Sequence, residues 1–187
     1  MTETTKSPIA SPVTASYTET SASLTLTDES AMSKFVVRAA SGTAARATLA
    51  QSFGGSRMSA DTLIVGIRPD EWFILGDEAA VAAWVGSLNT DGHVSIVDWT
   101  HGRAQFRITG DRATSLLEKV CALDWSDDMT PDGAATSGSV AKVTCDIIRN
   151  DVGVAPSYLV LSDRSFGQYL FDALLDAGDE FTITAIA

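Results

Sequence analysis

Cysteine is scarce in this chain, which has only Cys121 and Cys145 among its 187 residues. Their spacing matches no zinc-binding motif, and two cysteines do not make a disulfide framework in a chain of this length. We expect buried free thiols, as is usual in a reducing cytosol. The cysteine content therefore favours a cytoplasmic protein without a structural metal.

Positive charge is also in short supply. Lysine and arginine together number 13, against 24 aspartates and glutamates, and the formal net charge is −11. Nucleic acids and anionic membrane surfaces attract positive charge, so this composition argues against binding to either. No apolar run approaches the roughly 18 residues that a membrane-spanning helix needs. Neither nucleic acid nor a membrane is therefore expected as a partner.

Motifs for common chemistry are missing as well. The sequence has no G-x-S-x-G nucleophile elbow, no G-x-G-x-x-G dinucleotide motif and no phosphate-binding P-loop. Its two histidines, His93 and His101, are not accompanied by other ligands at metal-binding spacing. The aspartates between residues 124 and 132 lack the ligand pattern of a calcium-binding loop and are expected to be solvated. The motif analysis therefore assigns no catalytic residue and no metal ligand.

Serine and threonine dominate residues 1–33, where they supply 15 of the 33 positions. Little apolar mass is available there to offset the entropy lost on folding. The segment lacks the apolar stretch of a secretory signal and, with Lys6 as its single basic residue, the character of a mitochondrial presequence. We predict a flexible N-terminal arm over residues 1–33. Deleting residues 1–30 is expected to leave the thermal stability of the core nearly unchanged but to weaken assembly with a partner. Leu24 and Leu26 share one face of an extended segment that can pair with a partner.

From residue 34 onward, one order of predicted elements occurs twice. The first half has predicted strands near 35–37, 63–67, 72–75 and 94–99, and helices over 43–51 and 77–88. The second half has predicted strands over 104–109, 140–148, 158–161 and 181–186, and helices over 111–121 and 163–174, with a turn-rich stretch over 126–139. Each half reads β-α-β-β-α-β, the ferredoxin-like order. We predict an α+β fold of two tandem ferredoxin-like modules, residues 34–102 and 103–187, with mainly antiparallel sheets and helices on one face.

The two halves can also be aligned with each other. The segment WFILGD at residues 72–77 matches YLVLSD at residues 158–163, 86 positions later. The same offset pairs Leu75 with Leu161, and Trp84 with Leu170. The four paired residues are therefore expected in the cores of a duplicated unit.

The densest polar cluster between two predicted strands runs from Asp98 to Arg103. Within it, Trp99, His101 and Arg103 are candidates for binding an anion or contacting a partner. The alternative is a strand-to-strand junction in which Asp98 or Thr100 holds backbone groups.

This run and three further segments resemble one family. Residues 97–113 (VDWTHGRAQFRITGDRA) and 116–125 (LLEKVCALDW) resemble the gamma subunit of heterotetrameric sarcosine oxidase. So do residues 69–73 (PDEWF) and 164–170 (RSFGQYL). The similarity covers about residues 60–187, with the motifs in the order of that family, and none of them is a catalytic signature.

The resemblance implies a non-catalytic subunit of a flavin-dependent complex that oxidises the N-methyl group of sarcosine to yield glycine. It implies alpha, beta and delta subunits as partners. The cofactors FAD, FMN, NAD, tetrahydrofolate and zinc are implied in those partner subunits, with none in this chain. The isolated chain is expected to be inactive, and its role would be to bury apolar surface of a large subunit.

The same region more distantly resembles the aminomethyltransferase family, the T-protein of glycine cleavage. Its three motifs correspond to residues 97–101, 108–113 and 145–148. T-proteins hold folate with an acidic residue in the last of these strands, which makes Asp146 the folate candidate here. The alternative is that Asp146 is an aspartate at a strand edge near a turn, without a role in folate binding. Two alternatives therefore stay open, namely a small folate-dependent aminomethyltransferase-like protein and a free-standing ferredoxin-like module that binds a small metabolite.

Overall fold

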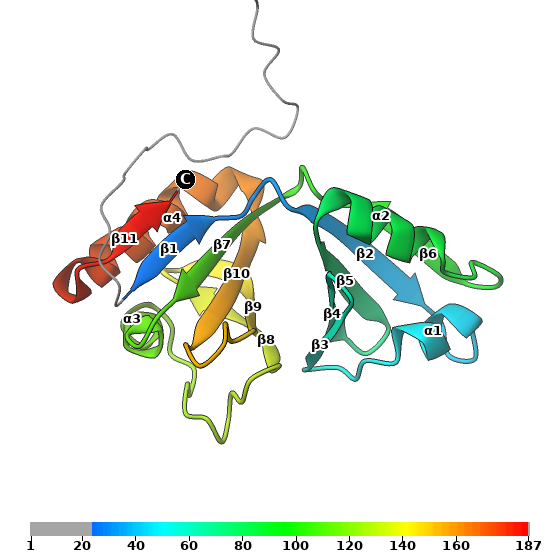
Figure 1. The fold of residues 1–187 in the computed structure, drawn as a ribbon, viewed down its shortest axis with the longest axis horizontal. Coiled ribbons are helices and arrows are strands. Elements are labelled where there is room, and N and C mark those ends of the chain that lie inside the picture. Colours follow the sequence, from blue (N-terminus) through cyan, green and yellow to red (C-terminus); the bar gives the residue numbers. More distant parts are fainter. Residues whose placement is uncertain (1–23, 187) are drawn as a thin grey trace, which may run out of the picture.

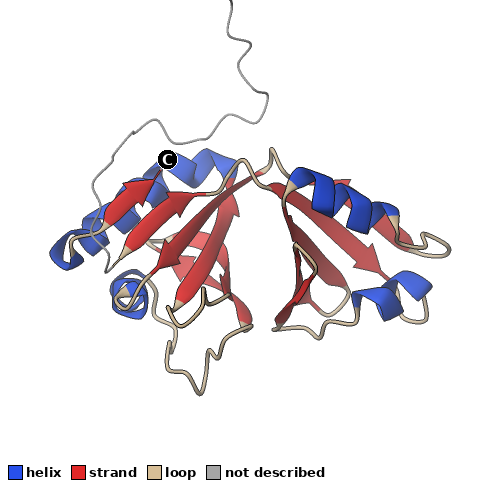
Figure 2. Ribbon diagram, viewed as in Figure 1, coloured by secondary structure: helices blue, strands red, loops and turns tan. Residues whose placement is uncertain are grey.

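Two β-sheets face each other across the molecule, and the helices lie on their outer surfaces (Figures 1 and 2). The computed structural model describes residues 24–186. Within this range, no helix is both long enough and apolar enough to span a bilayer.

The five-stranded sheet comes from the first half of the chain, and its strand order is β3-β4-β5-β2-β6. Its elements, with their helices, are β2 (Ser33–Ala39), α1 (Ala44–Leu49), β3 (Ser56–Ser59), β4 (Thr62–Arg68), β5 (Glu71–Gly76), α2 (Glu78–Gly86) and β6 (Val94–Asp98). Every neighbouring pair is antiparallel. Apart from the added edge strand β3, this is the arrangement of a ferredoxin-like module.

The six-stranded sheet has the order β11-β1-β7-β10-β9-β8. Its elements from the second half are β7 (Arg103–Thr109), α3 (Ala113–Val120), β8 (Ala135–Val140), β9 (Val143–Arg149), β10 (Ser157–Asp163), η1 (Arg164–Phe166), α4 (Gly167–Gly178), η2 (Asp179–Phe181) and β11 (Thr184–Ile186). The ferredoxin-like arrangement recurs here with two additions. β8 extends one edge, and β1 (Thr25–Asp28) is inserted between β11 and β7.

The insertion of β1 corrects the arm predicted over residues 1–33. β1 pairs in parallel with β11 and antiparallel with β7, and both Leu24 and Leu26 are fully buried. Leu24 and Leu26 do share a buried face, as predicted. However, β1 pairs with two strands of this chain instead of the predicted partner. The composition of residues 1–33 predicts a flexible arm because the segment itself has little apolar surface. In the structure, the second half of the chain supplies the apolar surface that β1 packs against. Residues from 24 onward belong to the fold, and the rest of the predicted arm lies outside the described residues.

Two edge strands, β3 and β8, are missing from the sequence prediction. Their sequences, SRMS and ATSGSV, are rich in serine and poor in large apolar residues. β8 occupies the end of the stretch expected to be turn-rich, and the predicted strand over residues 140–148 is in fact β9 with the last residue of β8. Both strands lie at the outer edge of a sheet, where less apolar surface has to be covered.

Apolar residues form one core beneath the helices of each sheet and a third core between the sheets. Phe73 and Leu75 from the first sheet meet Leu159 and Leu161 from the second in this inter-sheet core. Leu75 and Leu161 are 2% and 1% exposed, as the alignment of the halves predicts. Of the other aligned pair, Leu170 is fully buried in α4, whereas Trp84 of α2 is only half-buried, so the prediction is wrong for that side chain.

Candidate functional site

The polar run from Asp98 to Arg103 connects the two sheets, because β6 ends at Asp98 and β7 begins at Arg103. The Trp99 N–H donates to the Lys34 carbonyl (2.8 Å), and Thr100 Oγ1 accepts from the Lys34 N–H (3.0 Å). Asp98 Oδ1 accepts from the Thr100 N–H (2.8 Å). These contacts tie the connection to the start of β2, as expected for a strand-to-strand junction held by Asp98 and Thr100.

Arg103 is the centre of a charge cluster at this junction, in which Asp146 is buried and Asp163 is exposed. Its guanidinium lies 4.8 Å from the centroid of the Trp99 ring and pairs with Asp163 (Nη1–Oδ1, 3.3 Å). It also pairs with Asp146 (Nη2–Oδ2, 3.7 Å), and its side chain is 14% exposed. The cluster therefore joins the inter-sheet connection to β9 and β10 of the second sheet.

Asp146 lies on β9 and is 4% exposed. The Ser137 hydroxyl, on the neighbouring strand β8, donates to Asp146 Oδ1 at 2.7 Å. With Arg103 facing Oδ2, both carboxylate oxygens have partners within this chain. Asp146 is thus an interior strand residue rather than one at a sheet edge, and its engaged carboxylate suits an internal anchor better than a ligand contact.

His101 lies outside the Arg103 cluster. It is exposed and lines a surface depression of about 270 Å³ together with Asp98, Thr100 and Glu78. The structure therefore brings together Trp99, Arg103 and Asp146 from the predicted site residues and separates His101 from them.

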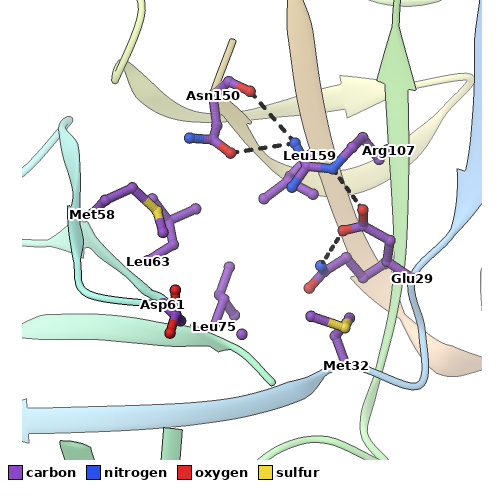
Figure 3. A pocket seen from close by; sticks show the side chains of 11 residues that line it. Glu29, Met32, Met58, Asp61, Leu63, Leu75, Arg107, Asn150 and Leu159 are labelled. Atoms are coloured by element: carbon purple, nitrogen blue, oxygen red, sulfur yellow. Dashed lines mark hydrogen bonds and ion pairs between the residues drawn. The ribbon is translucent and has the colours of Figure 1, made fainter. Parts of the chain in front are cut away.

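A second polar site lies in a cavity of about 140 Å³ between the two sheets. Figure 3 shows Met58, Leu63 and Leu75 from the first sheet on one side of this cavity, facing Arg107, Asn150 and Leu159 from the second. The cavity adjoins the inter-sheet core, since Leu63, Leu75 and Leu159 belong to both.

A chain of hydrogen bonds fixes the polar residues of the cavity. Glu29 accepts from Arg107 Nε (2.6 Å) and from Gln105 Nε2 (3.0 Å). Arg107 Nη1 also donates to Asn150 Oδ1 (3.3 Å) and to Ser157 Oγ (3.1 Å). These contacts connect β7 to the segment after β1 and to the ends of β9 and β10.

Sequence analysis overlooked this network, although its pattern is visible in β7. The strand reads RAQFRIT, in which Ala104, Phe106 and Ile108 alternate with polar residues. Such alternation normally indicates a strand with one solvated face. Here the polar face is turned toward the other sheet, and Gln105 is 2% exposed. The alternation marks the residues, but only the packing of the two sheets shows that they line a cavity.

Lys34 is a further buried charge at the junction, with 2% exposure. Its Nζ donates to the carbonyls of Ser30 (3.0 Å) and Met32 (2.6 Å). Burial lowers the pKa of the Lys34 ammonium to about 8, against the attraction of Asp28. Lys34 thus holds the connection between β1 and β2 in place with its side chain.

The two cysteines are free and buried, as predicted. Burial raises the pKa of the Cys145 thiol to about 12 and that of Cys121 above its ordinary value, so both stay protonated at neutral pH. Within residues 24–186, no three histidine, cysteine or carboxylate side chains gather closely enough to hold a metal ion.

Comparisons with known proteins place this geometry in context. A family model described as the GCVT N-terminal domain matches residues 29–187. A chain of the heterotetrameric sarcosine oxidase from Corynebacterium sp. U-96, in complex with pyrrole 2-carboxylate, superposes with a TM-score of 0.74 and 21% identity, covering 91% of each chain. No curated protein matches the sequence.

The glycine cleavage system aminomethyltransferase T from Bartonella henselae superposes with a TM-score of 0.66 and 12% identity. The match covers 88% of this chain and 48% of that one, so the present chain spans about half of the transferase. The resemblances to heterotetrameric sarcosine oxidase and to the aminomethyltransferase family are confirmed, as is the α+β fold with mainly antiparallel sheets, which is of the T-protein type.

Proposed function

Because the chain belongs to the family of the GCVT N-terminal domain, we propose that it is a non-catalytic, gamma-type subunit of a flavin-dependent heterotetrameric sarcosine oxidase. The observation that carries the proposal is the extent of the structural match. The similar oxidase chain and this one cover nearly all of each other, whereas this chain covers only about half of the transferase. A match of equal extent favours an equivalent subunit over a shortened transferase.

The subunit's role in this proposal is structural. It would bury apolar surface of a large subunit and hold that subunit's domains in register while sarcosine is demethylated to glycine in the cytoplasm. FAD, FMN, NAD, tetrahydrofolate and zinc would belong to the alpha, beta and delta partners. The engagement of Asp146 by Arg103 and Ser137 supports a structural role, because this carboxylate is the residue a folate-binding transferase would use.

Co-purification tests the proposal. An affinity tag on this chain, co-expressed with the alpha, beta and delta subunits, should recover a yellow heteromer that oxidises sarcosine and shows flavin absorbance. The isolated chain should be colourless and inactive with sarcosine. Turnover by the pure chain, or a complete oxidase that assembles without it, would contradict the proposal. Tetrahydrofolate binding by the isolated chain would instead favour the transferase alternative.

A further inference from the structure

One edge of the five-stranded sheet is open along β6. The strand pairs with β2 on one side, and no described strand pairs with its other side (Figure 1). Its sequence, VSIVD, has three β-branched apolar residues and neither the proline nor the lysine that commonly protects a sheet edge. Such an edge is a template for pairing with another extended segment.

The other edge strands of the two sheets are less suited to this pairing. β3 and β11 have only four and three residues. β8 is rich in serine, and its Ala135 N–H already donates to the Gly54 carbonyl at 2.9 Å. Among the strands of residues 24–186, β6 is therefore the edge best suited to receive a further strand.

The hydrogen-bond pattern shows which backbone groups β6 directs outward. Just beyond the end of the strand, the Trp99 N–H donates to the Lys34 carbonyl at 2.8 Å. Bonded residues alternate along an antiparallel pair, so the odd-numbered residues of β6 bond to β2. The N–H and C=O groups of Ile96 and Asp98 therefore point away from β2, toward the open edge.

An apolar surface borders this edge on the helix side of the sheet. Val94 and Ile96 are only partly buried, and both pack against the core beneath α1 and α2. Covering the rest of these side chains with an added strand would remove apolar area from water, which favours binding.

The surface depression of about 270 Å³ at the end of β6 adds negative charge. Phe35 and Ala82 supply apolar lining, and Glu78 and Asp98 supply carboxylates. Phe35 lies opposite Asp98 in the β2–β6 pair, so their side chains share one face of the sheet. Neither carboxylate forms an ion pair with a described residue. A lysine or arginine suits this space, because its aliphatic stem can lie on Phe35 while its charge faces the carboxylates.

We propose that β6 binds an extended segment of a partner protein, which adds to the five-stranded sheet as a further strand. The segment runs antiparallel to β6, as all neighbouring strands of this sheet do, and its backbone bonds to Ile96 and Asp98. A basic side chain enters the depression beside Glu78, and β-branched residues at alternate positions cover Ile96 and Val94. The proposal concerns this strand edge alone and does not depend on which complex the chain joins.

Titration of the full chain with a short peptide, followed by amide NMR, tests the proposal. The acetylated and amidated peptide SKSVSVS, in antiparallel register, places its lysine opposite Asp98 and its valines opposite Ile96 and Val94. Amide resonances of residues 94–98 should shift saturably, whereas those of β11, an edge of the other sheet, should not. Hydrogen exchange of the Ile96 amide should slow about tenfold when about nine-tenths of the chain is bound, because only the free edge exchanges.

Two altered peptides separate charge from backbone pairing. The peptide SESVSVS has glutamate in place of lysine and should bind about tenfold more weakly, because like charges then face each other. Methylation of the backbone nitrogen of the central valine removes the N–H that faces Ile96 and should abolish binding. Absence of saturable binding, or equal affinity for the three peptides, would overturn the proposal.

Two variants locate the basic side chain. Glu78→Gln removes an exposed charge from the depression and should weaken binding of the lysine peptide about threefold. Asp176→Asn removes an exposed charge from α4 of the other sheet and should leave the affinity unchanged. Equal effects of the two variants would contradict the placement of the basic side chain and overturn the proposal.

Hydrogen exchange and sedimentation without peptide decide whether this chain covers its own edge. The Ile96 amide should exchange rapidly in a monomeric chain. Slow exchange of this amide in the monomer would mean that another segment of the same chain occupies the edge. A dimer that forms with rising concentration and shifts residues 94–98 would mean that a second copy does. Either result would overturn the assignment of the edge to a partner.

Discussion

Charged residues are buried where the two halves of the chain meet. Arg103 faces Asp146 at the connection from β6 to β7, and Lys34 lies at the start of β2. Burying charge is costly, and a buried ion pair contributes little net stability compared with a well-packed apolar pair. Losing one partner is more costly still, because the other charge then stays buried without compensation. Such residues fix the arrangement of the junction more than they stabilise it.

Arg103→Met should therefore lower the free energy of unfolding by about 3–5 kcal/mol, because it leaves the Asp146 carboxylate buried without a countercharge, with the Ser137 hydroxyl still donating to it. Urea denaturation followed by circular dichroism measures the loss. Arg112→Met removes an arginine from an exposed position and serves as the matched control. Adding Asp146→Asn to Arg103→Met should recover part of the loss. Equal stabilities of Arg103→Met and Arg112→Met would show that the pair does not hold the junction.

Lys34 should make stability depend on pH in the alkaline range. Its pKa is about 8 in the folded state and near the ordinary 10.5 in the unfolded chain, which therefore binds more protons between these values. The free energy of unfolding should rise with pH through this window, by at most about 3 kcal/mol from this residue. The difference between the wild type and Lys34→Met, measured by urea denaturation from pH 7.5 to 10.5, isolates the effect. A difference that does not change with pH would contradict the depressed pKa.

At the level of elements, the strands that can be predicted from the sequence are the ones that are buried on both faces. The central strands β5 and β10 are buried on both faces and read as the continuous runs WFIL and YLVL, which identify them in the sequence. The edge strands β3 and β8 have little to bury and leave no such pattern. β1 is covered by surface from distant parts of the chain, so its local composition resembles that of an arm. The cavity network was missed for a related reason: the polar face of β7 looks the same whether solvent or a second sheet covers it.

Leu26→Ala tests whether β1 is part of the fold. Leu26 is fully buried in the core of the second sheet, so truncation should cost about 2–5 kcal/mol of unfolding free energy. Thr27→Ala, on the other face of the same strand and only partly buried, should cost less than about 1 kcal/mol. Thermal and urea denaturation of both variants give the comparison. Equal stabilities would mean that β1 contributes no more than the predicted arm.

At the level of the whole molecule, the inter-sheet core makes each half depend on the other. Val65 and Phe73 of the first sheet share this core with Ile148 and Leu161 of the second. Either half alone would expose these side chains to water, at a cost of about 1.5–3 kcal/mol for each large residue. The two ferredoxin-like modules therefore describe the topology, and we expect the two halves to fold as one unit.

The chain should accordingly unfold in one cooperative transition. Leu161→Ala is expected to lower the free energy of unfolding by about 2–5 kcal/mol and to shift that single transition without splitting it, because the lost contacts belong to both sheets. Differential scanning calorimetry measures this through the agreement of the calorimetric and van't Hoff enthalpies. Leu170→Ala, in the core beneath α4, should cost a similar amount and serves as the comparison within one half. Two separate transitions in the wild type, or a first half that melts unchanged in Leu161→Ala, would show that the two halves fold independently.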